Sequence, residues 1–306
     1  MSDKRALILG GAGFVGSNLA QKFLEGGWKV TVVDGLLART GGNKENLTKI
    51  TANINFIGLA IEQINNLETL VAENDLVIDS MGWTCHNLAW ANSLYDLKLN
   101  LQSHLPLIDV LKKFPGKRVI FLGSKSPPAP ADVQGVHKVA AESYFRIYSG
   151  LYRFNVVVVR FGNCFGVNQL RKGDDLGLVG SFIGDLLKKK KIKVYGHSRS
   201  RQLIYVEDLT SVIWEIAQRN WSGFDSYNLA GQSILIEELA KKLIKILGFG
   251  SYEVEKIPPK IAIIDSGNLR IEENKLRGLI GVIPRTNLEI ALVATVAYFK
   301  QNYDLA

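Results

Sequence analysis

Three glycines near the start of the chain have a spacing that suits the binding of phosphate groups. They lie in the segment GGAGFVGSN, which follows the apolar run ALIL (6–9) and precedes a helical pattern. Glycines permit a tight turn and a close approach of the backbone, and the following helix points unpaired N–H groups at a pyrophosphate. The spacing therefore predicts a dinucleotide site at the end of a first strand. Its expected contacts are Gly10, Gly13, Phe14, Val15 and Gly16.

The next apolar run, VTVVDG, ends on an acidic residue, Asp34, which Gly35 follows. A carboxylate at this place accepts hydrogen bonds from the hydroxyl groups of a ribose, and it repels a 2′-phosphate. We therefore expect the cofactor to be NAD, with contacts from Asp34 and Gly35. Arg39 lies nearby and keeps NADP as an alternative.

Short apolar runs alternate with amphipathic stretches through the first half of the chain. The runs at 6–9, 30–33, 54–58, 76–79, 118–123 and 156–159 are rich in valine and isoleucine and lack polar alternation. Strands of this kind belong to a parallel sheet that is covered by helices on both faces. We therefore expect an α/β fold with a Rossmann-type doubly wound parallel sheet, and a ligand outside the carboxyl ends of its strands.

The second half of the chain is less regular and predicts a smaller lobe. We expect a dinucleotide-binding domain over residues 1–166, to which residues 203–226 return, and a C-terminal substrate-binding lobe over residues 167–306. The Pro-rich segment SPPAPADVQG (126–135) is expected to form a surface loop. Consecutive prolines neither continue a helix nor join a sheet ladder.

Composition places the chain among packed globular proteins. Of its 306 residues 47% are apolar and 22% charged, and no apolar run reaches the ~18 residues of a membrane-spanning helix. Cys85 and Cys164 have no metal-ligand spacing, so we expect no metal site, no disulfide framework and a cytoplasmic location. The net charge of +8 favours anionic ligands. The lysine run 188–191 lacks interleaved aromatic residues, so nucleic acid is weakly supported as a partner.

Several further motifs, taken in order, resemble the extended short-chain dehydrogenase/reductase family, and within it the nucleotide-sugar epimerases, dehydratases and dehydrogenases. They are RVIFLGS (118–124), HKVAAE (137–142), RFGNCFG (160–166), RQLIYVEDL (201–209), YNLAG (227–231) and RIEENK (270–275). The resemblance covers nearly the whole chain. It implies an NAD domain, a small substrate lobe and transient oxidation of a hexose ring, most often at C4. The sugar is attached to a nucleoside diphosphate.

The resemblance also implies roles for individual residues. Ser124 takes the place of the catalytic Ser/Thr, and Lys138 that of the lysine that binds the nicotinamide ribose. Asn100 takes the place of the family's asparagine on the fourth helix. Further cofactor contacts are implied for Ser80, Met81 and Gly82.

On the substrate side, the resemblance implies contacts to the diphosphate or the nucleotide from Asn163, Arg201 and Arg270. Guanidinium groups suit this role because they fork onto phosphate oxygens. Segments 92–113 and 138–152 correspond to helices that form a four-helix interface in the family. We therefore expect a homodimer that binds a nucleoside-diphosphate sugar and has no membrane partner.

The family's Tyr-x-x-x-Lys motif is incomplete in this chain. Gln134 stands four residues before Lys138, where the family carries tyrosine. This spacing puts both side chains on one helical face if the helix begins early enough. The tyrosine exchanges a proton with the reacting hydroxyl, whereas an amide does not titrate. Losing a general base typically costs ~10²–10⁴ in rate, so another group is expected to move the proton.

Several groups are candidates for this proton transfer. His86 lies in a loop that borders the sugar pocket in relatives, and histidine titrates near neutrality; a packing role is its alternative. His137 is a second candidate, Ser124 with a water relay to Lys138 is a third, and Cys85 is a thiol without an obvious activating neighbour. The catalytic set that we predict is Ser124, Lys138, Gln134 and His86.

Two functions are consistent with these residues. The first is an NAD-dependent nucleotide-sugar-modifying enzyme, a dehydrogenase or epimerase with hydride transfer from a ring carbon and atypical proton transfer. Lys125 follows Ser124 in place of the Asp–Glu pair of many dehydratases, which disfavours 4,6-dehydration. The alternative is a catalytically inactive NAD-binding sensor or scaffold, because a fold does not carry a function with it.

Overall fold

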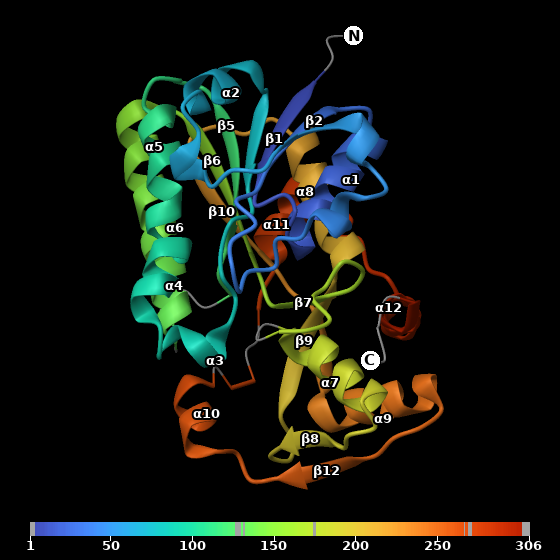
Figure 1. Cartoon of the computed structure of the whole chain (residues 1–306). Helices are drawn as coiled ribbons and strands as arrows, with labels where there is room; N and C mark the ends of the chain where they lie inside the picture. The colour runs from blue at the N-terminus through green and yellow to red at the C-terminus, as the bar shows by residue number, and fades with distance from the viewer. Residues whose placement is uncertain are drawn as a thin grey trace.

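The computed structural model describes residues 4–125, 130, 132–173, 176–265, 267–268 and 271–301, without the side chains of residues 86, 87 and 264. A parallel sheet with helices on both faces forms the upper part of the molecule in Figure 1. Two small sheets and their helices form the lower part. No helix of the described chain is both long and apolar enough to cross a membrane.

Within the described residues, seven parallel strands form the main sheet, in the order β3-β2-β1-β4-β5-β6-β10. They are β1 (Arg5–Leu9), β2 (Lys29–Val33), β3 (Ile54–Ile57), β4 (Leu76–Asp79), β5 (Arg118–Gly123), β6 (Asn155–Phe161) and β10 (Phe224–Leu229). The first six coincide with the six predicted apolar runs. The central residues of β1, β4, β5 and β6 are buried, which is why these runs show no polar alternation, whereas the edge strand β3 is only partly buried. The predicted doubly wound α/β fold is confirmed.

Helices cover both faces of this sheet. The hydrophobic core on one face contains residues of α1 (Phe14–Glu25), α8 (Val206–Gln218) and α11 (Asn274–Ile280). The core on the other face contains residues of α2 (Leu67–Glu73), α5 (Leu105–Leu111) and α6 (Val133–Tyr152). Successive strand residues point to opposite faces, so Leu7 joins one core and Ile8 the other. The long helix α6 runs beside α4 (Ser93–Asn100) at the left of Figure 1, above α3 (His86–Ala89).

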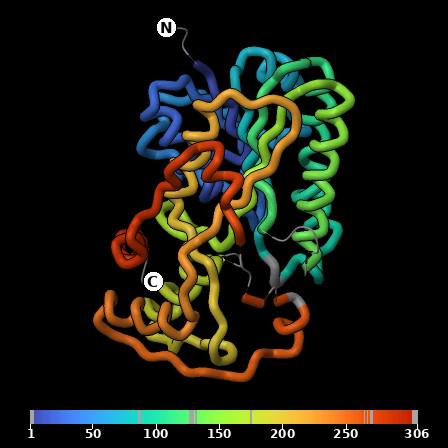
Figure 2. The backbone as a smooth tube through the Cα atoms, turned by 180° about the vertical axis from the view of Figure 1, so that it is seen from behind, coloured from blue at the N-terminus to red at the C-terminus, as the bar shows by residue number. Residues whose placement is uncertain are grey.

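The lower part has its own core. β9 (Ser200–Tyr205) pairs with β7 (Asn163–Phe165) and β11 (Gln232–Leu235), and β8 (Ile192–Tyr195) pairs with β12 (Tyr252–Glu255). These strands pack with α7 (Gly177–Leu187), α9 (Ile236–Leu247) and α12 (Leu288–Gln301). The 3-10 helices are Lys44–Leu47, Thr51–Asn53, Ile61–Gln63 and Gln102–His104. After α10 (Pro259–Ile264), the chain returns behind the sheet, where α11 packs against β10 and α8 (Figure 2).

The start of α6 corrects one expectation from the sequence. The loop predicted over 126–135 ends earlier, because the carboxylate of Asp132 accepts a hydrogen bond from the Gly135 N–H at 2.7 Å and caps a helix that begins at Val133. Residues 126–129 and 131 lie outside the described part of the chain. Gln134 and Lys138 therefore lie on consecutive turns of one helix, and both are buried.

Candidate active site

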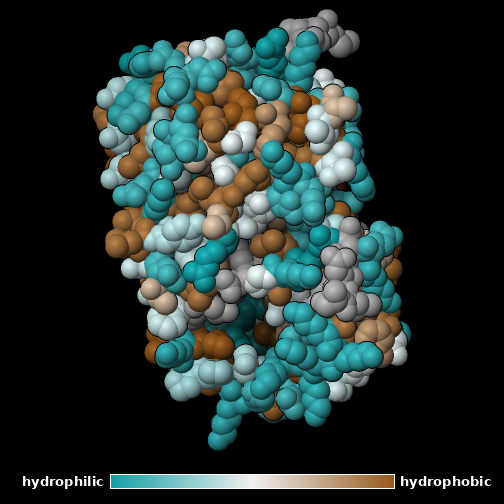
Figure 3. All heavy atoms as spheres, viewed as in Figure 1, coloured by the Kyte–Doolittle hydropathy of each residue, from teal (hydrophilic) through white to brown (hydrophobic). Residues whose placement is uncertain are grey.

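A cavity of about 530 Å³ lies at the carboxyl ends of the central strands of the main sheet. Its walls come from the glycine-rich loop (10–16), the ends of β2, β3, β4 and β5, the start of α6, and segment 161–178 of the lower part. Figure 3 shows that the surface is hollowed where the upper and lower parts meet. A ligand site outside the carboxyl ends of the strands is what the open sheet predicts.

The glycine-rich loop has the conformation that its sequence predicts. Gly10 has a φ of +71°, in the left-handed region that favours glycine, and its N–H donates to the Val33 carbonyl at 2.8 Å. A Cβ on Gly16 would lie 2.2 Å from the Gly10 carbonyl oxygen, so no larger residue fits there without movement of the backbone. Gly13 is the N-cap of α1 and offers no side chain to the first turn. The N–H groups of that turn can therefore bind a pyrophosphate.

Asp34 at the end of β2 is held by the backbone. Its carboxylate accepts hydrogen bonds from the Ala12 N–H at 3.0 Å and the Leu36 N–H at 2.8 Å. Burial raises the pKa of Asp34, and these amide hydrogen bonds oppose the rise. Each carboxylate oxygen keeps acceptor capacity for a ribose hydroxyl. The side chain is only 8% exposed, and it lines the cavity with Gly35.

Lys138 and Gln134 line the cavity from α6, and Ser124 lines it directly after β5. The Lys138 Nζ donates to the Met81 carbonyl at 2.7 Å and to the Leu122 carbonyl at 3.4 Å. Burial lowers the pKa of Lys138 to about 8, although nearby carboxylates oppose the shift. Gln134 is 8% exposed, and its amide has no hydrogen bond to any residue in the described chain. That amide is available to a ligand in the cavity.

A buried polar network fixes the loop that follows β4. The amide of Asn100 accepts from the Trp83 N–H at 3.0 Å and donates to the Trp83 carbonyl at 2.8 Å and to Asp96 at 2.9 Å. Asn100 is fully buried and is not among the residues that line the cavity, so it holds this loop from behind. Its direct contact with the cofactor stays a prediction.

Two histidines belong to the same supporting layer. His137 Nδ1 lies 2.6 Å from Asp96 Oδ1, and His137 does not line the cavity. His104 Nδ1 lies 2.7 Å from Asp79 Oδ2, and both side chains are fully buried. Cys85 is also buried away from the cavity, in a cluster with Trp83 and Leu99. The structure therefore places neither His137 nor Cys85 beside Gln134 in the cavity.

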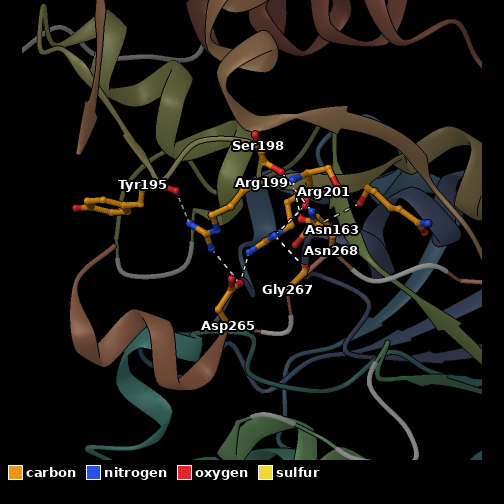
Figure 4. A network of polar contacts seen from close by, with 10 residues as sticks. Asn163, Tyr195, Ser198, Arg199, Arg201, Asp265, Gly267 and Asn268 are labelled. Atoms are coloured by element: carbon orange, nitrogen blue, oxygen red, sulfur yellow. Dashed lines mark hydrogen bonds and ion pairs between the residues drawn. The ribbon is translucent and has the colours of Figure 1, made fainter. Parts of the chain in front are cut away.

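A guanidinium network adjoins the main cavity (Figure 4). Arg201 on β9 forms an ion pair with Asp265, which also pairs with Arg199 at 3.0 Å. The Arg201 Nη1 donates to the Gly267 carbonyl at 3.1 Å. Burial lowers the pKa of Arg201, and the nearby Asp265 opposes this. The network connects β9 of the lower part to the segment that follows α10, and Asn163 lines the small pocket that contains Arg201.

The structure brings most of the predicted site residues together. The main cavity is lined by Gly10, Gly13, Phe14, Val15, Gly16, Asp34, Gly35, Ser80, Met81, Gly82, Ser124, Gln134, Lys138 and Asn163. Arg201 lines the small adjoining pocket. His86 begins α3, but its side chain lies outside the described part of the structure, and so does all of Arg270.

Sequence reasoning missed several residues that line the cavity. Residues 40–42 and 59–62 follow β2 and β3, and the rule that ligands bind at strand ends could have indicated them. Cys164 and Gln169 come from the lower part, where the sequence offered no such rule. Lys125 also lines the cavity. The sequence signal for it was its position directly after Ser124.

Comparisons with known proteins extend over most of the chain. The sequence profile of the NAD dependent epimerase/dehydratase family matches residues 6–230. A putative UDP-glucose 4-epimerase of Methanocaldococcus jannaschii is 23% identical over 314 residues, which cover 97% of this chain and 98% of that protein.

Solved structures share the fold over nearly the full length. The UDP-N-acetylglucosamine 4-epimerase from Methanobrevibacter ruminantium M1, in complex with UDP-N-acetylmuramic acid, has a TM-score of 0.86 at 24% identity, with 98% of this chain and 99% of that chain covered. The Bordetella bronchiseptica enzyme WbmF, in complex with NADH, has a TM-score of 0.84 at 25% identity, with 98% and 93% covered. The family match includes the glycine-rich loop, Ser124, Gln134, Lys138 and Arg201.

Proposed function

Because the chain belongs to the NAD dependent epimerase/dehydratase family, we propose that it modifies a nucleoside-diphosphate sugar by hydride transfer from a ring carbon. One observation carries the proposal. A single cavity joins a dinucleotide site, built from the glycine-rich loop and Asp34, to Ser124, Gln134 and Lys138. A pocket with the Arg201 guanidinium adjoins this cavity at Lys125 and Asn163, and none of the described residues that line it belongs to the glycine-rich loop. This arrangement suits a cofactor at the loop, a reacting sugar near Ser124 and a diphosphate at Arg201.

NAD is the cofactor of the family, and the residues of this cavity fit it. The N-terminus of α1, without a side-chain cap, suits the pyrophosphate, and Asp34 suits the ribose of the adenosine. Lys138, held by the Met81 carbonyl, suits the second ribose. When bound, NAD⁺ supplies the acceptor for a hydride.

Ser124 and Gln134 position the hydroxyl group that is oxidised. Both line the cavity beside Lys138, and the Gln134 amide is free to donate to the oxygen and to accept from the proton. Neither an amide nor a serine hydroxyl is a base near neutral pH. The proton therefore has to leave to a titratable group, directly or through water.

On the substrate side, Asn163 and Arg201 bind the diphosphate. Arg201 forms an ion pair with Asp265 in the free protein, so phosphate oxygens compete with this carboxylate for the guanidinium. Both Arg201 and Asn163 line the small pocket that adjoins the main cavity, which supports a diphosphate site next to the sugar. Arg270 is the third predicted contact, and its role stays a prediction.

Oxidation or epimerisation is favoured over 4,6-dehydration. Lys125, not a carboxylic acid, follows Ser124 and lines the cavity, so the acid and base that many dehydratases use beside the sugar are not supplied from this position. A dehydrogenase releases the ketone, and an epimerase returns the hydride to it. The alternative, a sensor that binds NAD and sugar without chemistry, is favoured by Gln134 alone.

The test is a titration of the purified protein with a panel of nucleoside-diphosphate sugars. Bound nicotinamide is identified first, and then near-ultraviolet absorbance reports reduced cofactor while mass spectrometry and NMR report the product. Lasting reduced cofactor means a dehydrogenase, and an isomerised sugar without it means an epimerase. Tight binding of both ligands with neither signal would overturn the enzymatic proposal and leave the sensor.

We also propose a homodimer formed by α4 and α6. Exposed apolar side chains gather on these helices, among them Leu94, Val136, Ile147 and Leu151, next to the stacked rings of Tyr144, Tyr148 and Tyr152. Hydrophobic atoms reach the surface at this edge of the molecule (Figure 3). An exposed patch of this kind marks a protein interface.

Light scattering tests the dimer. Ile147→Glu combined with Leu151→Glu is expected to give monomers, because both side chains are at least half exposed and a carboxylate opposes burial in an interface. A monomeric wild-type protein would contradict the proposal. The cytoplasmic location stays a prediction.

A further inference from the structure

We propose that Lys125 accepts and returns the proton of the reacting sugar hydroxyl, the task that Gln134 cannot perform. The inference rests on the proposed function and assigns to it the residue that moves the proton.

Lys125 lies where the two ligand pockets meet. It directly follows Ser124 at the end of β5, and it lines both the main cavity and the small pocket that contains Arg201. Among the described residues, only Gly162 and Asn163 also line both pockets, and neither of them has a titratable side chain. A sugar that joins the cofactor side to a diphosphate at Arg201 has to pass this junction.

Among the described residues, the other titratable side chains that line the main cavity are engaged or unsuited. Asp34 accepts two backbone hydrogen bonds, and Glu62 pairs with Lys98 at 3.4 Å. Burial raises the pKa of Cys164, so its thiol stays protonated. Lys125, in contrast, has no hydrogen bond or ion pair with any residue that the structure describes. Its amine is free to meet a ligand.

Lys138 is the remaining titratable side chain in this cavity wall within the described part of the chain, and its geometry gives it a different task. Its Nζ donates to the carbonyls of Met81 and Leu122, which hold it against the loop that follows β4. An ammonium fixed by two carbonyls suits the binding of a ribose. Proton transfer to Lys138 would require loss of these hydrogen bonds or an intervening water.

The surroundings of Lys125 favour its neutral form. Burial lowers the pKa of Lys125 and the positive charge of Arg201 adds to this, while the carboxylates of Asp132 and Asp265 oppose it. These groups face Lys125 from β9, from the N-cap of α6 and from the segment after α10. A lowered pKa brings a lysine closer to the value at which general bases work best.

The chemical step balances with these groups. The neutral Lys125 amine takes the proton as the sugar O–H bond breaks, and the electron pair of the adjacent C–H bond leaves as hydride to NAD⁺. The alcohol becomes a ketone, the amine becomes an ammonium, and NADH is formed. In the return step the ammonium gives the proton back to the ketone oxygen as hydride returns to the carbon. An epimerase returns that hydride to the opposite face.

Lys125→Arg and Lys125→Ala test the proposal together. Arginine keeps the positive charge but does not titrate in this range. Both variants should bind NAD as the wild type does and lose ~10²–10⁴ in kcat. The acidic limb of the wild-type pH profile should disappear in both variants. Small primary amines in the buffer should restore turnover to Lys125→Ala and not to Lys125→Arg.

A second measurement does not depend on activity. Acetylation of Lys125 as a function of pH, followed by mass spectrometry with the exposed Lys190 as the reference, reports the titration of its amine directly. We expect the Lys125 amine to titrate at a lower pH than the reference and in the range of the acidic limb. Titration at the pH of the reference would overturn the proposal even if both variants are inactive.

The outcomes separate this inference from the proposed function. A wild-type protein that turns over no nucleotide sugar refutes the proposed function, and this inference falls with it. A wild-type protein that is active while Lys125→Arg keeps its rate and pH profile refutes this inference alone. That second result would show that Lys125 contributes charge, as in the recognition of an anionic sugar.

Discussion

Replacement of Lys138 by methionine should change how the stability of the protein depends on pH. Lys138 is 6% exposed, and burial lowers its pKa from an ordinary 10.5 to about 8. Between these values the unfolded chain binds more protons than the folded one, so the free energy of unfolding rises with pH. Below pH 8 the lysine is charged in both states. Its burial then destabilises the fold by roughly 3 kcal/mol, from a pKa difference of about 2.5 at about 1.36 kcal/mol each.

The wild type should therefore gain roughly 2–3 kcal/mol relative to Lys138→Met between about pH 7 and pH 10. The variant also loses the hydrogen bonds to the Met81 and Leu122 carbonyls, but this loss shifts its curve by an amount that does not depend on pH. Urea unfolding at several pH values measures the difference between the two curves. Lys190→Met, which removes an exposed lysine, is the control and should run parallel to the wild type. Parallel curves for Lys138→Met and the wild type would refute the reasoning.

Three further changes test the site. Gly16→Ala should weaken NAD binding and cost about 1–3 kcal/mol of stability, because its Cβ would lie 2.2 Å from a carbonyl oxygen of the same loop. Gly278→Ala is the control, because a Cβ there meets open space in a helix, and it should stabilise the protein by about 0.5–1 kcal/mol. Calorimetry measures the stability of both variants, and a similar change for Gly16→Ala and Gly278→Ala would contradict the prediction. Asp265→Asn should tighten the binding of a nucleoside diphosphate by about fivefold, because Arg201 loses a competing ion pair of about 1 kcal/mol; weaker binding would mean that Asp265 orients the guanidinium. Gln134→Leu should lower kcat by about tenfold, the value of one hydrogen bond, without a change in the pH profile, and a shifted profile would contradict a purely positioning role.

Most of the main sheet could be predicted because its central strands are buried on both faces. The apolar runs indicated the strands β1 to β6 because runs rich in valine and isoleucine are typical of a parallel sheet under helices. β10 reads FDSYNL and lies at the edge of the sheet beside β6. Its polar residues tolerate this position because only one neighbour covers the strand, and for the same reason its sequence lacks the signal of a buried strand.

The site could be predicted where it depends on strand ends and could not where it depends on distant partners. The positions of Ser124 and Asp34 follow from the strands that they end. Arg201 and Asp265 are 64 residues apart, and no local pattern indicates that they pair. The early start of α6 had a local signal, since Asp132 is a good N-cap, but the neighbouring prolines pointed to a longer loop.

Gln134 stands where the resemblance predicts a tyrosine, and the structure places its side chain in the wall of the cavity. Its amide lines the cavity, has no hydrogen bond to any described residue and is not among their buried side-chain polar atoms without a partner. A hydroxyl group in the cavity can therefore bind it. The amide N–H can donate to the oxygen in both states, and its carbonyl accepts from the hydroxyl before oxidation. Under the proposed function, binding of the reacting oxygen and removal of its proton are divided in this chain between Gln134 and a separate base.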